Sequence, residues 1–379
     1  MTGEVRILHV VPRVVRRGAE VFAAQLAEAL QSVSSNLLFP LFGPAEGAAA
    51  AKVRVVGGAR PPGRLERGIG VDPGAVARLR VGLQRLRPDL VVAHGGEPMK
   101  YAVLADTRGR IPLAYRKISH AVGSRGERIL ARLYDRPALI LAVTDELKRE
   151  LVEEFAVDPQ RVVVIPTSRR APPELSTEQR TAVRRDIGAG PERPLLAWVG
   201  RMSEEKQPGA ALQAFALIGS RFGPCSLAFC GDGPLRGSVE RAAETVGSGV
   251  LVLGSREDAD RIIAASDLLL STSRTEGAPG VLVEAGLAGV PVVAYAVGEV
   301  AGIIRNGETG ALVRPGDLDA MADAACLLLA DPVARARMSE AAKEACRPFE
   351  LTTVAARYAD AFAAILGDRG APLRVSWGH

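Results

Sequence analysis

The feature that most restricts the fold of this sequence is a regular alternation of short apolar runs with longer segments of helical spacing. Such alternation is typical of parallel α/β units, in which each buried strand is followed by a helix that crosses back over the sheet. In the first half it predicts strands near Ile7–Val11, Leu37–Leu41, Val53–Val56, Leu90–Ala93, Leu113–Tyr115, Ile140–Val143 and Val162–Ile165, with a helix over Val21–Leu30.

The alternation is interrupted once, by a polar, proline-containing stretch from Pro166 to Pro194 that holds one short helix, Thr177–Asp186. A second series then predicts strands at Leu195–Val199, Leu227–Phe229, Val250–Leu253, Leu268–Ser271 and Val292–Tyr295. A chain of 379 residues is longer than one core usually serves. We therefore predict an N-terminal domain over residues 1–170, completed by a C-terminal helix at about 353–366, and a second domain over residues 171–352.

The segment from Ser271 to Ala294 carries the strongest chemical signal, because it reads as a strand end, a Gly/Pro turn, a helix and a second strand. Glu276 lies in the turn and Glu284 in the helix, among residues too apolar to face solvent. A buried carboxylate needs partners, and two carboxylates on one loop-helix unit can accept hydrogen bonds from several hydroxyls. The free N–H groups at the helix start can meet phosphate or sugar oxygens.

Three other turns follow predicted strands in the second half. Gly200-Arg201 and Lys206 precede a helix that begins near Pro208, so two cations stand beside a helix N-terminus, as a diphosphate site requires. Gly231-Asp232-Gly233-Pro234 is interpreted as a structural turn. Gly254-Ser255-Arg256 follows the strand Val250–Leu253.

These motifs resemble the family 4 retaining glycosyltransferases, which have a GT-B fold of two facing Rossmann-like domains with a cleft between them. The resemblance rests on the pair Glu276 and Glu284, the Gly-Val-Pro-Val-Val run that follows it, the Gly-Arg…Lys segment and the Gly-Asp-Gly-Pro turn. It covers nearly the whole chain, best in the second half. Where many members have Pro-Asn-Gly, this sequence has Pro166-Thr167-Ser168-Arg169.

The resemblance implies a nucleotide diphosphate sugar as donor and assigns roles in its site. Arg201 and Lys206 would hold the diphosphate, and Glu284 the ribose hydroxyls. Glu276 would contact the transferred sugar, with backbone donors from the stretch Gly277, Ala278, Pro279 and Gly280. Gly254, Ser255 and Arg256 would form the base pocket. Gly18, in a loop that resembles the family's Gly-Gly-x-Glu, would approach the donor phosphate, although Arg17 replaces the first Gly.

Two histidines are candidates for contact with the reacting sugar or the acceptor. His120 lies where many members of the family carry a histidine, and His94 ends a predicted strand before Gly95-Gly96 on an expected cleft-facing loop. His9 lies within a strand and is expected to pack. No metal site is predicted, because Asp258 and Asp317 are expected to cap helices. We expect no cofactor.

The charge distribution is asymmetric: residues 1–170 hold 27 Lys and Arg against 17 Asp and Glu, and the remainder holds 21 against 26. A basic first half suits an anionic partner such as a lipid headgroup, and a solvated Arg-rich surface explains it equally well. The segment Val76–Arg87 is expected to be a Rossmann helix, with a membrane-surface helix as the alternative. The four cysteines are expected to be buried free thiols. No apolar run is long enough to cross a bilayer, so a cytoplasmic location is expected, with peripheral association at the inner face of the membrane left open.

The sequence therefore predicts a retaining, metal-independent glycosyltransferase that uses a nucleotide sugar, with UDP favoured, and an unidentified acceptor hydroxyl. The biosynthesis of cell-envelope glycan, exopolysaccharide or a natural product would fit, and a nucleic-acid partner is not expected. The alternatives are a catalytically silent GT-B subunit that binds sugars, and a sugar-nucleotide epimerase. A dinucleotide-dependent oxidoreductase is disfavoured, since no Gly-x-Gly-x-x-Gly follows the first strand. The sequence predicts neither the oligomeric state nor a role for the tail Gly370–His379.

Overall fold

A computed structural model describes residues 4–13, 18–42, 53–56, 71–119, 131–190, 193–247, 249–276 and 280–367. The chain divides into two compact units, the first comprising Met1–Ser168 with Leu351–His379 and the second Arg169–Glu350. The predicted boundary at residue 170 and the predicted return at residue 353 each lie two residues from those of the structure.

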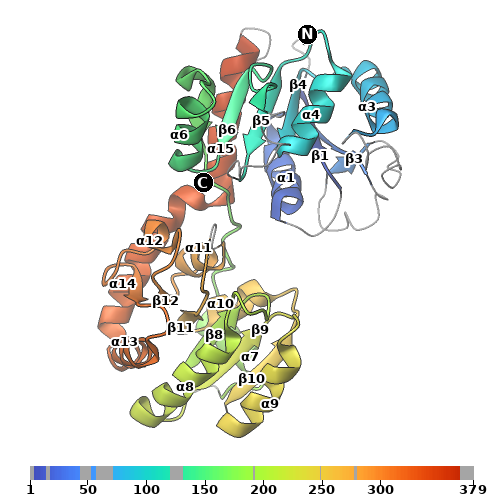
Figure 1. The fold of residues 1–379 in the computed structure, drawn as a ribbon. Coiled ribbons are helices and arrows are strands. Elements are labelled where there is room, and N and C mark those ends of the chain that lie inside the picture. Colours follow the sequence, from blue (N-terminus) through green and yellow to red (C-terminus); the bar gives the residue numbers. More distant parts are fainter. Residues whose placement is uncertain are drawn as a thin grey trace. The chain divides into compact units, whose positions relative to one another are not determined.

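The first unit is built on a seven-stranded parallel sheet with the strand order β3-β2-β1-β4-β5-β6-β7 (Figure 1). The interior strand β1 pairs with β2 on one side and with the central strand β4 on the other. The strands are β1 (Arg6–Val11), β2 (Ser35–Pro40), β3 (Arg54–Val55), β4 (Leu90–His94), β5 (Leu113–Lys117), β6 (Leu139–Ala142) and β7 (Val162–Val164).

Helices cover both faces of this sheet. One face packs against α3 (Pro73–Leu86), α4 (Gly96–Ala105) and α6 (Asp145–Glu153). The other face packs against α1 (Gly18–Ala29) and α15 (Leu351–Leu366), so the last helix completes the core of the first unit. Short 3-10 turns lie at Leu30–Ser32 and Pro159–Arg161.

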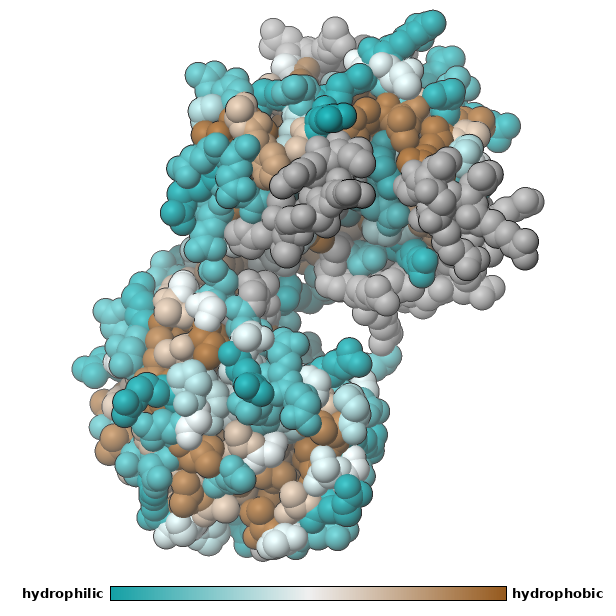
Figure 2. Space-filling model, viewed as in Figure 1, coloured by the Kyte–Doolittle hydropathy of each residue, from teal (hydrophilic) through white to brown (hydrophobic). Residues whose placement is uncertain are grey.

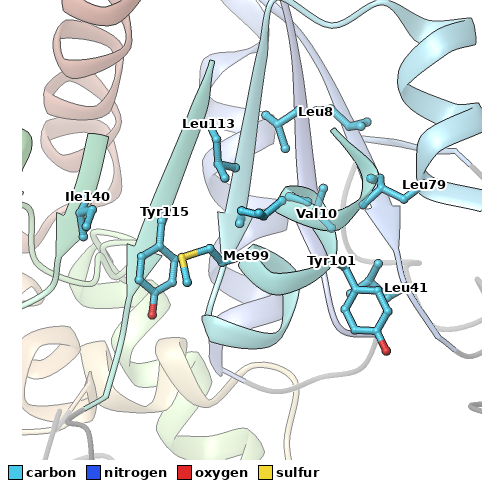
Figure 3. Packing of buried hydrophobic residues seen from close by; sticks show 14 of the residues in the cluster. Leu8, Val10, Leu41, Leu79, Met99, Tyr101, Leu113, Tyr115 and Ile140 are labelled. Carbon is cyan, nitrogen blue, oxygen red and sulfur yellow. The ribbon is translucent and has the colours of Figure 1, made fainter. Parts of the chain in front are cut away.

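The core between the sheet and α3, α4 and α6 is closely packed. Figure 3 shows Met99 of α4 pointing toward the ring of Tyr115 on β5, with Leu8 and Val10 of β1 nearby. The start of α3 is set by Asp72, whose carboxylate accepts hydrogen bonds from the N–H groups of Gly74 and Ala75, and by Pro73 at the first helical position. The core between the sheet and these helices is thus formed by the strand side chains on this face of the sheet and by the apolar sides of the helices.

The second unit holds a six-stranded parallel sheet with the order β10-β9-β8-β11-β12-β13. Its strands are β8 (Leu195–Val199), β9 (Ser226–Cys230), β10 (Val250–Gly254), β11 (Leu268–Ser271), β12 (Val292–Tyr295) and β13 (Gly310–Val313). Its helices are α7 (Thr177–Asp186), α8 (Pro208–Phe222), α9 (Arg236–Val246), α10 (Ala259–Ala265), α11 (Gly280–Leu287), α12 (Val300–Ile303), α13 (Leu318–Ala330) and α14 (Pro332–Cys346), followed by a 3-10 turn at Arg347–Phe349.

One face of the second sheet packs against α8, α9 and α13, and the other packs against α7, α10, α11 and α12. The short helix α7 has the predicted limits because Ser176 and Gln179 form a capping box at its start. The strand β13 was not predicted from the sequence. Its four residues, Gly-Ala-Leu-Val, include only two large apolar side chains and lie between polar turns, so they give no clear strand signal.

Several smaller predictions can be compared with the structure. Cys225, Cys230 and Cys346 are buried free thiols as predicted, whereas Cys326 is only half-buried. Asp317 caps α13 as predicted, by accepting a hydrogen bond from the N–H of Ala320. The capping prediction for Asp258 is wrong, because its carboxylate binds the guanidinium of Arg256 and no cap hydrogen bond forms.

The arginines of α3 are partly used for packing. Arg80 donates to the carbonyls of Leu104 and Ala105 at the end of α4, and Arg78 donates to the carbonyl of Leu41. These contacts agree with the prediction of a helix that packs on the sheet. None of the helices in the described part of the chain is long and apolar enough to cross a membrane.

Candidate functional site

A pocket of about 240 Å³ lies in the second unit at the carboxyl ends of β8 and β11. Parallel strands bring their carboxyl ends to one edge of a sheet, and helices that follow them point free N–H groups toward that edge. The residues that line the pocket come from these two strand ends, from α11 and from the start of the unit: Arg169, Trp198, Val199, Gly200, Lys206, Leu270, Ser271, Ser273, Glu276, Gly280, Val281 and Glu284.

A partly buried ion pair joins the two loops at the strand ends. The ammonium Nζ of Lys206 lies 2.5 Å from Oε1 of Glu276, and the hydroxyl of Ser273 donates to the same carboxylate oxygen at 2.6 Å. The side chain of Glu276 is only 6% exposed, against 25% for Lys206. The sequence predicted both residues for the donor site, and the structure brings them into direct contact.

Backbone contacts hold these two loops together. Thr272 is fully buried, and its hydroxyl donates to the carbonyls of Lys206 and Gln207. The indole N–H of Trp198 donates to the same hydroxyl at 3.2 Å. The position of Lys206 relative to Glu276 is therefore set by buried groups: Thr272, which does not line the pocket, and Trp198, which does.

The loop after β12 fixes the backbone of Glu276. The carbonyl of Glu276 accepts a hydrogen bond from the N–H of Glu299 at 3.0 Å. Gly298 has a φ of +48°, and a Cβ there would lie 2.1 Å from the carbonyl oxygen of Glu276. Gly298 is thus a positioning residue that sequence reasoning missed, and its only signal was a glycine shortly after a predicted strand.

Glu284 lies on α11 and faces a cation from a different segment. Its Oε1 lies 3.4 Å from Nε of Arg169, and the two side chains are 32% and 27% exposed. Burial raises the pKa of Glu284, with a smaller contribution from Asp260, and the nearby charge of Arg169 opposes that rise. The sequence predicted Glu284, but it did not predict Arg169 as part of the pocket.

The two predicted diphosphate cations differ in position. Lys206 lines the pocket, whereas Arg201 is exposed and is not among the described residues that line it. The loop that carries Arg201 is held by the Gly231–Pro234 turn: a Cβ on Gly231 would lie 1.8 Å from the carbonyl oxygen of Gly200. This agrees with the structural interpretation of that turn.

The predicted base pocket lies elsewhere on the same sheet edge. Gly254, Ser255 and Arg256 do not line the described pocket. The guanidinium of Arg256 pairs with Asp258 at 2.7 and 2.8 Å and with Asp186 at 3.3 Å, which raises the pKa of Arg256. The side chain of Arg256 is thus already bound to carboxylates, and a contribution from this backbone to base binding stays a prediction.

His94 does not lie on an open loop as expected, and this prediction needs correction. It is the last residue of β4 and is 1% exposed. Its Nε2 lies 3.0 Å from Nδ1 of His9, whose Nε2 lies 3.0 Å from the amide oxygen of Asn36. Burial lowers the pKa of both histidines, that of His9 to about 4. His94 is therefore a neutral core side chain in this structure, and His9 packs as expected.

The remaining predicted residues are not placed in a site by the described structure. His120, Gly277, Ala278 and Pro279 lie outside the described residues. Gly18 is the first residue of α1, and its approach to a donor phosphate stays a prediction. Gly280 does lie in the pocket, as the first residue of α11. Over the described ranges, no group of three or more His, Cys, Asp or Glu side chains is arranged to hold a metal ion.

Comparison with protein families matches both halves of the chain. Residues 16–168 match the model described as "Glycosyltransferase Family 4", and residues 193–331 match "Glycosyl transferases group 1". In solved structures, HepE of Anabaena in complex with UDP and glucose is similar over 95% of this chain and 100% of that one, with a TM-score of 0.73 and 21% identity. WaaG, a glycosyltransferase involved in lipopolysaccharide biosynthesis, is similar over 94% of this chain and 99% of that one, with a TM-score of 0.67 and 18% identity.

Curated relatives are similar over part of their length. The alpha-D-kanosaminyltransferase of Streptomyces kanamyceticus is 29% identical over 231 residues, which are 60% of this chain and 59% of that protein. The D-inositol 3-phosphate glycosyltransferase of Corynebacterium glutamicum (strain R) is 31% identical over 281 residues, 68% of this chain and 66% of that protein. With two parallel sheets in the GT-B arrangement of elements, this chain belongs to the glycosyltransferase family 4, group 1.

Proposed function

We propose that this protein is a retaining glycosyltransferase that transfers a sugar from a nucleotide diphosphate sugar, with UDP favoured as the nucleotide, to an acceptor hydroxyl. The observation that carries the proposal is the pocket of the second unit, where Lys206 contacts Glu276 at 2.5 Å and Glu284 faces the same space. HepE, a structural neighbour with bound UDP and glucose, supports a nucleotide-sugar donor.

Each pocket residue has a role in this proposal. Lys206, joined by Arg201 when its side chain turns inward, neutralises the charge that develops on the leaving nucleotide diphosphate. Glu276 accepts hydrogen bonds from hydroxyls of the transferred sugar, and Glu284 accepts those from the ribose. The N–H groups at the start of α11 face phosphate oxygens, since a helix N-terminus favours negative charge.

The proposed reaction is a displacement on one face of the sugar. The bond between the anomeric carbon and the donor phosphate oxygen breaks, and a bond to the acceptor oxygen forms on the same face. The leaving phosphate oxygen takes the proton of the acceptor hydroxyl, so no enzymic nucleophile is needed. This step and its independence of a metal ion follow from the family resemblance. The cations of the pocket can balance the diphosphate charge without an ion.

The acceptor is proposed only as a class: a hydroxyl in cell-envelope glycan, exopolysaccharide or natural-product biosynthesis. The similar proteins differ in this respect: one is an alpha-D-kanosaminyltransferase, one is a D-inositol 3-phosphate glycosyltransferase, and WaaG is involved in lipopolysaccharide biosynthesis. We propose a cytoplasmic location for the enzyme.

We further propose peripheral contact with an anionic membrane surface through α3. An apolar hollow of about 430 Å³ beside this helix is lined by residues that include Phe39, Val81 and Arg85. Val81 of α3 is 42% exposed, and Figure 2 shows further hydrophobic residues at the surface of the first unit toward α4. Val81→Asp should reduce co-sedimentation with vesicles that contain phosphatidylglycerol. Leu327→Asp, which changes a 72% exposed leucine of the second unit, should leave it unchanged. Equal sedimentation of both variants and the wild type would contradict this contact.

The donor site is tested by thermal stabilisation with UDP, GDP, ADP and TDP, without added metal. We expect selective stabilisation by one diphosphate, and loss of that stabilisation in Glu284→Ala. A wild-type protein that responds to none of the four would overturn the transferase proposal and favour a silent subunit of the same fold.

A further inference from the structure

Arg169 is the first residue of the second unit, and it is anchored there by its backbone. Its N–H donates to the carbonyl of Phe349 at 2.8 Å, and it forms a parallel bridge with Glu350. These contacts place its side chain among the residues that line the pocket. The position directly follows the stretch Pro166–Ser168, where the sequence departs from the Pro-Asn-Gly run of the resembling family.

The guanidinium of Arg169 lies against the first residue of α11. A Cβ on Gly280 would lie 2.0 Å from both Nε and Nη2 of Arg169, so a larger residue there would require the guanidinium to move. A cation at a helix N-terminus meets a partial charge of its own sign, which is unfavourable. Glu284, 3.4 Å away, offsets part of this repulsion.

The charges of the pocket therefore form two pairs, Lys206 with Glu276 and Arg169 with Glu284. In the proposed function both carboxylates bind hydroxyl groups of the donor. When the hydroxyl groups of the donor donate hydrogen bonds to a carboxylate, that carboxylate depends less on the hydrogen bonds of its paired cation. The cation is then free to bind a phosphate group of the donor. The two cations and the start of α11 together face the space where the diphosphate would lie.

We propose that Arg169 binds the phosphates of the donor as a pocket cation beside Lys206, exchanging the carboxylate of Glu284 for phosphate oxygens. This inference rests on the proposed function, which it extends by a residue that the family resemblance does not assign. The planar guanidinium suits the role because it can donate two parallel hydrogen bonds to a phosphate. A second cation also offsets the part of the negative charge of the diphosphate that Lys206 alone does not neutralise.

The test compares ligands with and without phosphates. The diphosphate that binds the wild type best is titrated calorimetrically into the wild type and into Arg169→Ala, Arg169→Lys and Arg170→Ala. The matching nucleoside is measured by competition. Arg170 is exposed and does not line the pocket, so its substitution is a control with the same change in net charge.

We expect Arg169→Ala to weaken the diphosphate by about 10-fold to 100-fold and the nucleoside by less than about 3-fold, because a charge-assisted bidentate contact is lost only for the phosphates. Arg169→Lys should lie between Arg169→Ala and the wild type, and Arg170→Ala should match the wild type.

Three results would overturn the inference. Equal weakening of nucleoside and diphosphate would mean that Arg169 only positions Glu284 for the ribose. Tighter diphosphate binding by Arg169→Ala would mean that the arginine blocks the pocket. Unchanged diphosphate binding would mean that it does neither. A wild type that binds none of the four diphosphates would instead remove the proposed function itself, and so is distinguishable from these outcomes.

Discussion

The two sheets of this protein bring ionisable side chains to the same kind of edge and use them differently. In the first unit, His94, Arg116 and Lys117 lie at the ends of β4 and β5, and His9 lies within β1; each is at most 1% exposed. His9 binds His94, and Lys117 pairs with Glu150 at 3.1 Å. In the second unit, Lys206 and Glu276 meet in an open pocket. Among the described residues, a shared fold thus gives a closed structural edge in one unit and an accessible charged edge in the other.

This difference shows that polar side chains at a strand end can bind a ligand only where they remain accessible from a pocket. Arg116 illustrates the closed case, since its guanidinium stacks 3.9 Å from the centroid of the Phe22 ring and donates to Thr167 at 2.8 Å. These contacts hold β5, α1 and the end of the unit together. A charged residue after a strand is therefore not by itself a functional signal.

The open edge should be the more sensitive of the two to loss of a charge. Glu276→Gln should lower turnover by about 100-fold, because it removes a charged acceptor for sugar hydroxyls and leaves the half-buried Lys206 without its carboxylate. Release of the nucleotide diphosphate from a panel of nucleotide sugars measures this. Glu205→Gln is the matched control, since that carboxylate is 59% exposed and 4.0 Å from Lys206. Similar activities of the two variants would remove Glu276 from the site.

The closed edge should instead respond to acid. The pKa of His9 is lowered to about 4, and that of His94 is also lowered, so the folded state resists protonation while the unfolded state takes up protons below about pH 6.5. The stability of the fold with its buried, neutral histidines is therefore highest above that pH, and it falls as the pH is lowered toward 4. At pH 5 the loss from His9 alone is about 2 kcal/mol, and His94 changes stability in the same direction.

Hydrogen exchange can resolve this effect unit by unit, after correction for intrinsic rates. Amides of β1 and β4 should lose more protection than those of β8 and β11 between pH 7 and pH 5. His9→Gln should reduce the loss in β1 and β4. If both units lost protection equally in the wild type, the buried histidines would not account for acid sensitivity.

The third prediction separates a positioning glycine from an ordinary one. Gly298→Ala should lower turnover by about 10-fold, because its Cβ would collide with the carbonyl of Glu276 and displace that residue. Gly307→Ala is the control: its φ is +79°, so the backbone strain is similar, but no atom lies within 4 Å of the added Cβ. Gly307→Ala should cost about 1 kcal/mol of stability and leave turnover unchanged. Equal turnover in both variants would show that Glu276 tolerates the displacement.

The sequence predicted most of the fold because apolar periodicity directly reflects which faces are buried. The limits of β8, β11, β12 and α7 agree with prediction, since each is bounded by clear turn or capping residues. The strand β13 was missed because its run of large apolar residues, Leu312 and Val313, is too short to stand out.

The site was predicted only in part. Glu276, Glu284 and Lys206 were found because they lie in local motifs. Arg169 and Gly298 reach the site from distant segments, through contacts that depend on the packed structure. His94 was misjudged because sequence position indicates the end of a strand but not the depth at which its side chain is buried.

The smallest effect concerns the titration of the open edge, where the pKa shift is upward rather than downward as in the closed edge. Burial raises the pKa of Glu284, and the charge of Asp260 adds to the rise. Since an ionised Glu284 is needed to accept ribose hydroxyls, diphosphate affinity should fall as the pH drops through this raised pKa. Asp260→Asn removes one cause of the rise, so it should move the midpoint of that fall to lower pH, by less than about one unit. Calorimetric titrations from pH 8 to pH 4 measure the shift, with Asp319→Asn as a control on a distant exposed carboxylate. A midpoint that moves upward, or that moves equally in the control, would show that Glu284 does not govern the acid limb of binding.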